Sequence, residues 1–272
     1  MCTPAGALNV LLFAVPVMYF VGVSFLQVRG FQLVPEPTLS NYGRTFTDYG
    51  GVILATLALS FVTALITTVL GFVYAAACRF SSARVAAALI ALSLLALFGG
   101  YLAKLYAWRI ILGPNGVLNS ALMMLHLIDQ PLEFLVFSDA AVVIALTHYA
   151  LPLAVLPIYA SLRSVDETTI AAARDLGASH LAILRDVLLP LTSTGLFAAF
   201  SLTFLLVAGD GIAARLLGGS SSQLIGPFIL NQFGFRVNAP LGSAMAFSML
   251  GMSMLVLAAL AATGRMLLRQ RW

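Results

Sequence analysis

Long apolar runs separated by short polar segments dominate the pattern of this chain. A helix needs about 20 predominantly apolar residues to cross a hydrocarbon core of roughly 30 Å, and six runs have the required length. These runs cover residues 7–27, 52–77, 86–107, 139–161, 192–214 and 240–263. The alternation of apolar and polar residues that marks a membrane β-barrel is absent. The pattern therefore predicts an all-α, polytopic membrane protein with about six transmembrane helices.

Two of these runs have features that bear on how they cross the membrane. The third run is interrupted near its end by Gly99, Gly100 and Lys104, although a single span is still expected there. The first run has no basic segment before it and no small-residue cleavage site after it. We therefore expect a retained helix rather than a cleaved signal peptide.

The composition agrees with a membrane protein and excludes several other classes. Hydrophobic residues make up 61% of the 272 positions and charged residues 9%, and the mean hydropathy is +1.02. Soluble domains contain about 25% charged residues, so an ordinary water-soluble enzyme is excluded, and a disordered chain requires the opposite composition. The net charge of +4 is too small and too scattered for a nucleic-acid surface. We expect the lipid bilayer, and no nucleic acid, among the partners.

Basic residues divide unevenly between the two sides of the predicted membrane protein. Eight arginines lie in short segments after the second, fourth and sixth runs, namely Arg79, Arg84, Arg163, Arg174, Arg185, Arg265, Arg269 and Arg271. The opposite side carries six basic residues in longer loops or near span ends, namely Arg29, Arg44, Lys104, Arg109, Arg215 and Arg236. Because cytoplasmic loops are enriched in Lys and Arg, this pattern predicts that both termini are cytoplasmic.

The cytoplasmic segment 162–191 is more than a connector between two spans. Asp166 suits the N-cap of a helix that Gly177 would end, and Ser179 can cap a second helix that reaches Leu189 and ends at Pro190. The apolar surface of this elbow consists of Ile170, Leu176, Leu181, Leu184 and Val187. Such a surface fits an amphipathic hairpin in the lipid interface. It equally fits a helix that docks into a groove of a partner protein.

The residues AARDLGAS at 172–179, followed by LP at 189–190, resemble the EAA loop of ABC-importer permeases. Ala171 stands where that family usually has Glu, which removes one possible ion pair with the ATPase, and His180 replaces a frequent Pro. The resemblance implies that this segment is the coupling helix that contacts an ATPase subunit. The residues implied to make that contact are Ala172, Ala173, Arg174, Asp175, Leu176, Gly177, Ala178 and Ser179.

Further stretches resemble the spermidine/putrescine-type branch of these permeases. They are LSNYGRTFTD at 39–48, LYAWRIILGPNGVLNSAL at 105–122, LLGG at 216–219, IGPFILNQF at 225–233 and APLGSAMAF at 239–247. Their order and spacing hold from about Leu39 to the C-terminus. The resemblance implies a type I ABC-importer permease fold in one transmembrane domain, residues 1–272, with a core at about 50–263.

The resemblance also implies a division of labour among several chains in a bacterial inner membrane. This chain would be a non-catalytic subunit that forms half of the solute pathway with a second, homologous permease. Two ATPase subunits would bind ATP and Mg, and an extracytoplasmic solute-binding protein would deliver the solute. The chain itself agrees with this division. An ATP-binding phosphate loop needs a lysine directly after a glycine, but the single lysine of this chain, Lys104, follows Ala103. The phosphate-binding motif G-x-x-x-x-G-K-[ST] is therefore absent.

No cofactor, metal or catalytic constellation is predicted for this chain. His126, His148 and His180 lie in separate segments, and a packing histidine is the expected role of His148. Cys2 and Cys78 have no metal-ligand spacing, and we expect them to be free thiols.

Two other classes of membrane protein fit this sequence less well than an ABC permease does. An ion-coupled secondary transporter often carries buried carboxylates and internal repeats, but the span centres are nearly free of acidic residues and no repeat is visible. Asp210, near the end of the fifth run, is the main exception. A membrane scaffold or signalling subunit would need neither the elbow nor a polar pathway.

The candidate residues for a solute pathway are Asp210, Tyr106, Trp108 and Lys104. Asp210 stands where the polyamine branch commonly has Glu, and carboxylates and aromatic faces both attract cations. The alternative for Asp210 is a structural role, either capping a helix or pairing with Arg215. Tyr106 and Trp108 could equally be interfacial anchors.

The basic residues beside these aromatics keep a second kind of solute open. Lys104 and Arg109 would repel a diamine unless they are paired, and Ala213-Ala214 replaces the branch's usual TP. The same machinery could therefore import an opine, an amino acid derivative or an aminophosphonate with a negative group.

Overall fold

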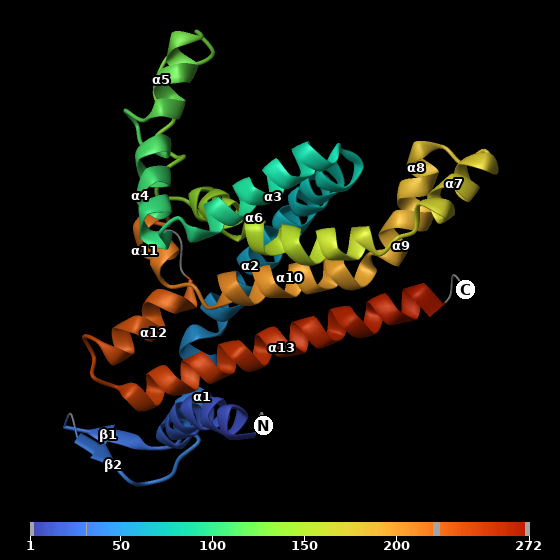
Figure 1. The fold of residues 1–272 in the computed structure, drawn as a ribbon. Coiled ribbons are helices and arrows are strands. Elements are labelled where there is room, and N and C mark those ends of the chain that lie inside the picture. The colour runs from blue at the N-terminus through green and yellow to red at the C-terminus, as the bar shows by residue number, and fades with distance from the viewer. Residues whose placement is uncertain (1–2, 31, 220–223, 270–272) are drawn as a thin grey trace.

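The computed structural model describes residues 3–30, 32–219 and 224–269. Helices make up most of the described structure, and a short hairpin of two strands is the only sheet within it (Figure 1). The elements in chain order are α1 (Thr3–Ser24), β1 (Gln27–Arg29), β2 (Gln32–Val34), α2 (Ser40–Phe80), α3 (Ala83–Phe98), α4 (Tyr101–Leu112), α5 (Val117–Met124), α6 (Asp139–Arg163), α7 (Glu167–Asp175), α8 (His180–Ile183), the π-helical segment η1 (Leu184–Leu188), α9 (Leu189–Leu191), α10 (Ser193–Ala208), α11 (Ile212–Leu217), α12 (Ile225–Phe233) and α13 (Ala239–Arg269).

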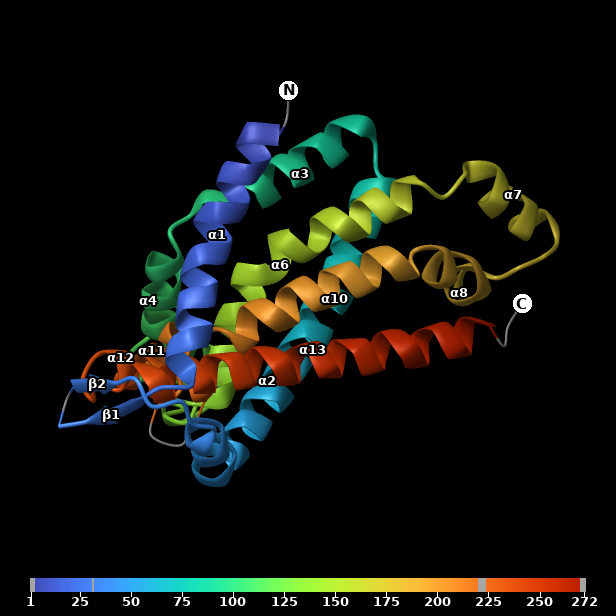
Figure 2. The same ribbon diagram turned by 90° about the horizontal axis from the view of Figure 1, so that it is seen from below.

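Three helices, α2, α6 and α10, pack against one another and form the centre of the bundle. Helix α13 packs along α2, α10 and α12, and α1 contacts α13, which it crosses in Figure 2. Helices α7 and α8 lie at one end of the bundle, where α13 also ends, whereas α4, α5 and α11 lie at the other end (Figure 1). The helices α7 and α8 are therefore separated from α4 and α11 by the length of the bundle.

Small residues let the central helices approach closely. A Cβ on Gly195 of α10 would lie 2.7 Å from the carbonyl oxygen of Pro157 and 2.4 Å from the Cβ of Ser161, both in α6. A Cβ on Gly71 of α2 would lie 3.3 Å from the Cβ of Ala154, on the same helix α6. Membrane helices associate largely through such close packing, because lipid tails leave little hydrophobic driving force.

A row of buried hydroxyl groups follows one face of α2. Thr56, Ser60, Thr63 and Thr67 each donate to the carbonyl oxygen four residues earlier, at 2.7–2.8 Å. These bonds satisfy polar groups that would otherwise be costly to bury in a membrane. The Thr56 hydroxyl also accepts a bond of 2.9 Å from the backbone N–H of Ile225, which fixes the start of α12 against α2.

The all-α prediction is confirmed. Some of the expected spans are continuous helices in the structure, and others are bent. Helices α2, α6 and α13 are each long and apolar enough to cross a membrane, and two bent pairs bring the number of candidate spans among the described residues to five. The first run forms the 22-residue helix α1, which contains the apolar stretch Val10–Ser24. The count of six spans stays a prediction.

Two spans expected to be continuous are broken. The third run was expected to form one helix over 86–107, but Gly99 and Gly100 adopt extended backbone conformations and α4 turns away from α3, giving a bend of 96°. The fifth run was expected to extend over 192–214, but α10 ends at Ala208 and the turn Gly209–Gly211 separates it from α11. The first break occurs at the adjacent Gly99 and Gly100, and the second at Gly209 and Gly211. Glycine has the greatest backbone freedom of all residues.

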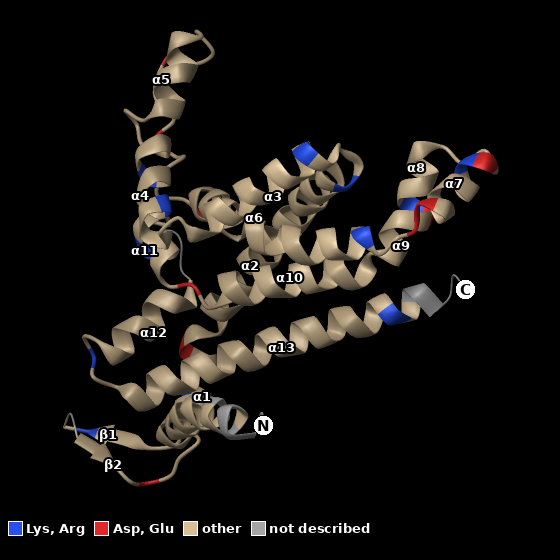
Figure 3. Ribbon diagram, viewed as in Figure 1, with Lys and Arg blue, Asp and Glu red and all other residues tan. Residues whose placement is uncertain are grey.

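Charged residues lie at the two ends of the bundle, and the middle of the long helices is free of them (Figure 3). Six of the predicted cytoplasmic arginines lie in helix segments at the end that carries α7 and α8: Arg79 and Arg163 in the last turns of α2 and α6, Arg84 at the start of α3, Arg174 and Arg185 in α7 and η1, and Arg265 near the end of α13. Arg271 and Cys2 lie outside the described residues, whereas Cys78 is a buried free thiol. The structure therefore gathers the described members of the predicted cytoplasmic group at one end.

Candidate functional site

The elbow, residues 167–191, begins with α7. Asp166 occupies its N-cap position, but the side chain makes no capping bond there, and the backbone carbonyl of Asp166 accepts from Thr169 N–H instead. The predicted N-cap position of Asp166 is therefore confirmed, although its side chain makes no capping bond. The predicted cap at Ser179 is confirmed, since its hydroxyl oxygen accepts from Ala182 N–H at 3.2 Å.

Gly177 ends α7 in the left-handed conformation, as predicted, with φ of +82°. The Gly177 N–H donates to the Arg174 carbonyl at 2.8 Å, and the Ala178 N–H donates to the Ala173 carbonyl at 3.0 Å. These two bonds form a Schellman motif, which satisfies carbonyls left without partners at a helix end. The motif sets the angle between the two arms of the elbow.

The second arm of the elbow is longer than predicted. Helix α8 continues through the π-helical segment η1 into α9, so Pro190 does not end it. The chain bends only at Thr192, and the second arm and α10 make an angle of 69°. Pro190 is the second residue of α9 and directly follows the π-helical segment η1. The spacing of the helical hydrogen bonds changes at this junction, so the helix can accept a residue that has no N–H to donate.

The apolar surface of the elbow divides into two groups. Ile170 is buried, and Leu184 and Val187 pack against the same cluster that contains Leu162 and Val165. In contrast, the side chains of Leu176 and Leu181 are 89% and 72% exposed. Of the implied coupling residues, Ala173 and Ala178 are half-buried against the cluster, and Ala172, Arg174, Asp175, Leu176, Gly177 and Ser179 are exposed. Two exposed leucines therefore flank the Gly177 turn.

An ion pair fastens the first arm of the elbow to the bundle. The guanidinium of Arg79, at the end of α2, lies 3.1 Å from the carboxylate of Glu167, and Arg79 is only 18% exposed. The first arm is therefore held by two contacts, this ion pair and the burial of Ile170.

At the other end of the bundle, Asp210 lies in the turn between α10 and α11. One carboxylate oxygen accepts from the N–H groups of Ile212 and Ala213, at 3.1 and 2.7 Å, and so caps α11. The other oxygen accepts from the hydroxyl of Tyr101 in α4. The predicted alternative of a capping role is therefore observed.

The other structural alternative for Asp210, a pair with Arg215, is wrong. The Arg215 guanidinium donates to the side-chain oxygen of Asn231 and thereby connects α11 to α12. Arg109, the second basic residue near the aromatics, lies over the ring of Phe137, 5.3 Å from its centre. Neither arginine neutralises the Asp210 carboxylate.

One face of α4 gathers polar and aromatic groups at this end of the bundle. Tyr101, Lys104 and Trp108 recur at helical spacing, and the Tyr101 ring packs against Tyr149 of α6, with centroids 4.6 Å apart. The Lys104 ammonium lies 5.4 Å from the centre of the same Tyr149 ring. Tyr106 does not share the helical spacing of these three residues and is 50% exposed. Tyr106 is the one pathway candidate that the structure does not place in this group.

Trp108 completes the group through its indole nitrogen, which lies 3.2 Å from Nδ1 of His148. An indole can only donate, so His148 accepts at Nδ1. We name these residues the polar corner: Tyr101, Lys104, Trp108, His148, Tyr149 and Asp210. Sequence reasoning missed Tyr101 and Tyr149, although the spacing of Tyr101 from Lys104 and Trp108 was a signal.

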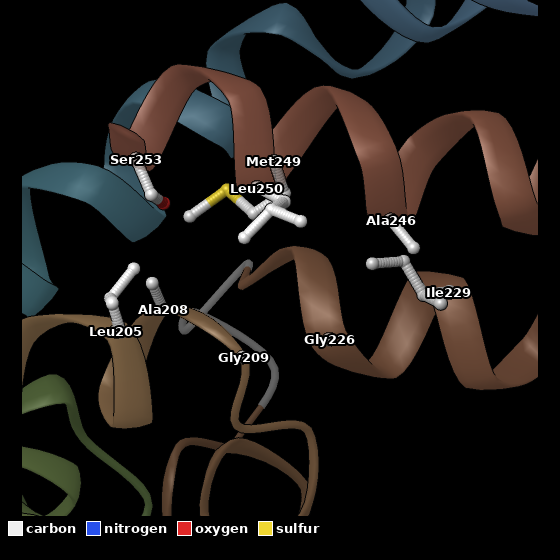
Figure 4. Close-up of a pocket in the computed structure, with 9 residues that line it drawn as sticks. All are labelled: Leu205, Ala208, Gly209, Gly226, Ile229, Ala246, Met249, Leu250 and Ser253. Atoms are coloured by element: carbon white, nitrogen blue, oxygen red, sulfur yellow. The ribbon is translucent and has the colours of Figure 1, made fainter. Parts of the chain in front are cut away.

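A cavity of about 210 Å³ lies between α10, α12 and α13 (Figure 4). Its lining consists of Leu205, Ala208, Gly209, Gly226, Ile229, Ala246, Met249, Leu250 and Ser253. The Ser253 hydroxyl, the single polar side chain of this lining, has no hydrogen-bond partner among the described residues. An apolar cavity cannot replace the hydration of a charged solute. The polar corner is therefore the better candidate for a cationic solute.

Among the described residues, no three His, Cys, Asp or Glu side chains lie close enough together to hold a metal ion. The three histidines lie in different parts of the fold, as the sequence suggested.

Comparison with known proteins places the chain among transport components. Residues 118–271 match the family described as binding-protein-dependent transport system inner membrane component. The spermidine/putrescine transport system permease protein PotB of Escherichia coli is 32% identical over 252 residues, which cover 91% of each chain. The PotB protein of Haemophilus influenzae is 30% identical and covers 86% of this chain and 82% of the relative.

A solved structure supports the fold independently. A bacterial ABC transporter involved in the import of the acidic polysaccharide alginate matches with a TM-score of 0.72, over 96% of this chain and 92% of that chain, at 14% identity. At that identity the likeness concerns the fold alone. The fold is that of a type I importer permease, as predicted.

Proposed function

Because this chain belongs to the family of binding-protein-dependent transport system inner membrane components, we propose that it is the permease subunit of an ATP-driven importer of polyamines such as spermidine or putrescine. The observation that carries the proposal is the identity of 32% with a spermidine/putrescine permease across 91% of both chains. As a member of this family the chain is a multi-pass inner-membrane protein. Its role is passage of the solute rather than catalysis.

The elbow is the proposed contact with the ATPase. Leu176 and Leu181 present two exposed apolar side chains on a turn that is fixed by Gly177. A short helix with apolar side chains fits a groove on a partner protein. The elbow projects past the end of the bundle in Figure 1, which supports docking over burial in the lipid interface. ATP and Mg would bind to two such ATPase subunits.

The elbow end of the bundle is accordingly the proposed cytoplasmic side, with both termini facing it. The six described arginines at that end agree with the enrichment of basic residues in cytoplasmic segments. The remaining proposed partners are a second, homologous permease and an extracytoplasmic solute-binding protein. The polar corner then lies toward the side from which the binding protein delivers its solute.

The polar corner suits a cationic solute for electrostatic reasons. The Asp210 carboxylate has no basic partner among the described residues. It accepts from the Tyr101 hydroxyl, and the Tyr101 ring packs against the ring of Tyr149. Cation–π contacts contribute about 0.5–2 kcal/mol each. A carboxylate with adjacent aromatic faces is therefore a suitable environment for an alkylammonium group.

A second candidate solute follows from Lys104. This ammonium has no carboxylate partner among the described residues, so its charge would also attract a solute with a negative group. The same machinery would then import an opine, an amino acid derivative or an aminophosphonate.

The test is uptake by the complete complex in proteoliposomes, with ATP enclosed and the solute-binding protein outside. We expect import of radiolabelled putrescine or spermidine that requires ATP and the ATPase subunits. Import by this chain alone without ATP would instead identify an ion-coupled carrier. Import of an anionic amino compound in preference to both polyamines would favour the second candidate.

The elbow contact is tested in the same complex by Leu176→Asp together with Leu181→Asp. Each change places a charge where an apolar side chain would be buried against the ATPase, so we expect the ATPase to be lost on purification. Thr168→Asp is the matched control. It adds one such negative charge at an exposed position in the first turn of α7, where a negative charge is favourable to the helix. Full recruitment by the double variant would remove the elbow from the interface.

A further inference from the structure

The side chain of Lys104 folds back across the corner between α3 and α4. Its ammonium donates to the carbonyl oxygen of Ala96, in the last turn of α3, and lies 5.4 Å from the centre of the Tyr149 ring. The side chain is half-buried, and none of the ion pairs in the described structure involves it. A positive charge is thus held by a carbonyl and an aromatic face.

The surroundings of this ammonium have the properties of a cation site. The last carbonyls of a helix have no partners within the helix and carry a partial negative charge. The face of a tyrosine ring attracts cations by its quadrupole. Gly99 leaves room for the stem of the lysine, because a Cβ there would lie 3.0 Å from Lys104 Cε. We name Ala96, Gly99 and Tyr149 the ammonium cradle.

The cradle is joined to the Asp210 carboxylate by a pair of packed rings. The Tyr149 ring lies against the Tyr101 ring, and the Tyr101 hydroxyl donates to Asp210. A carboxylate and a carbonyl–aromatic site thus flank the same two tyrosines. A molecule with two ammonium groups on an apolar chain has the complementary chemistry.

We propose that the ammonium cradle is a binding site for one primary ammonium group of the transported amine, and that Lys104 occupies it while the permease is empty. An entering amine displaces the Lys104 ammonium, whose stem has four rotatable carbons. Lys104 therefore takes the place of the solute's ammonium group and keeps the cradle occupied between transport cycles. This inference rests on the proposed function, since it concerns the manner in which the same permease binds a polyamine.

The test compares wild type with Lys104→Ala in the complete importer, with n-butylammonium as a probe that carries one ammonium group. Removal of the Lys104 ammonium leaves the cradle open. The concentration of n-butylammonium that halves putrescine uptake should therefore fall at least about threefold, as expected from the loss of one competing cation–π contact. Uncharged n-butanol should have no effect on either protein. An unchanged or raised inhibitory concentration would overturn the proposal.

A second substitution separates the cradle from a general change in charge. Adding Tyr149→Leu to Lys104→Ala removes the aromatic face and should return the inhibitory concentration to at least its wild-type value. Tyr159→Leu, added instead, is the matched control, because it makes the same exchange near the other end of α6. If Tyr149→Leu and Tyr159→Leu act alike, the cradle is not the site.

Thermal unfolding measures binding to the cradle without transport, so it tests this inference separately from the proposed function. We expect n-butylammonium to raise the unfolding temperature of the purified Lys104→Ala complex but not that of the same complex with Tyr149→Leu. If wild type imports no polyamine but this shift is observed, the proposed solute is wrong and the cradle stands. If polyamines are imported but neither the shift nor the change in inhibition is observed, the cradle is wrong and the proposed function stands.

Discussion

Replacement of Gly177 by valine tests whether the shape of the elbow couples ATP hydrolysis to transport. Gly177 has φ of +82°, and a Cβ at this position would meet no atom within 4 Å. The cost of a side chain here is therefore conformational rather than steric. The left-handed conformation costs an L-residue roughly 1–2 kcal/mol, and a β-branched side chain, which is restricted further, should lie at the upper end.

The consequence for the turn follows from that magnitude. A cost of about 1.4 kcal/mol lowers the population of the native turn roughly tenfold relative to competing conformations. The bonds from Gly177 to Arg174 and from Ala178 to Ala173 would then break about ten times as readily relative to the formed turn. Leu176 and Leu181, which lie on either side of the turn, would no longer hold one relative position.

The assay is recruitment of the ATPase subunits on purification, combined with the ratio of ATP hydrolysed to solute imported. We expect Gly177→Val to reduce recruitment or to raise this ratio several-fold, while the protein still accumulates in the membrane. Gly177→Asn is the matched control, because asparagine tolerates the left-handed region, and Gly177→Ala should lie between the two. Wild-type recruitment and coupling in Gly177→Val would refute the reasoning. An equal loss in the Asn and Val variants would show that the cost does not come from backbone conformation.

Three further predictions concern the polar corner and its support. Asp210→Asn should lower polyamine uptake at least several-fold without lowering membrane expression, because the amide oxygen can still cap α11 while the negative charge is lost; unchanged uptake would make Asp210 purely structural. Gly226→Ala should lower the unfolding temperature of the purified complex, since its Cβ would lie 2.3 Å from the Asp210 carbonyl oxygen and such overpacking costs about 1–3 kcal/mol; a wild-type unfolding temperature would contradict this contact. Trp108→Ala should reduce uptake more than Tyr106→Ala, because only Trp108 belongs to the polar corner, and a comparison of initial uptake rates decides between them.

The elbow shows how far local patterns reach. The ends of its helices were predictable at Gly177 and Ser179, because caps and left-handed turns depend on a few neighbouring residues. The division of its leucines was not predictable. Leu184 packs inward and Leu181 is exposed, and this difference depends on where the end of α6 happens to lie.

The polar corner shows the opposite case. Asp210, Lys104 and Trp108 could be selected from the sequence as chemically unusual residues in apolar surroundings. Their grouping with Tyr149 could not, because it requires α4 to fold back at Gly99 and Gly100. The sequence indicated an interruption there but not the direction of the turn.

By itself, the sequence determined that this is an α-helical membrane protein with an elbow beside its fourth span, because span length, charge placement and helix caps are local properties of the chain. The tertiary structure alone decided which side chains meet across the bundle. Asp210 became the cap of α11 and the partner of Tyr101, rather than of Arg215 five residues away, because Arg215 is directed to α12. Contacts between residues such as Tyr101 and Asp210 depend on how four helices pack at once, and no local pattern of residues encodes that packing.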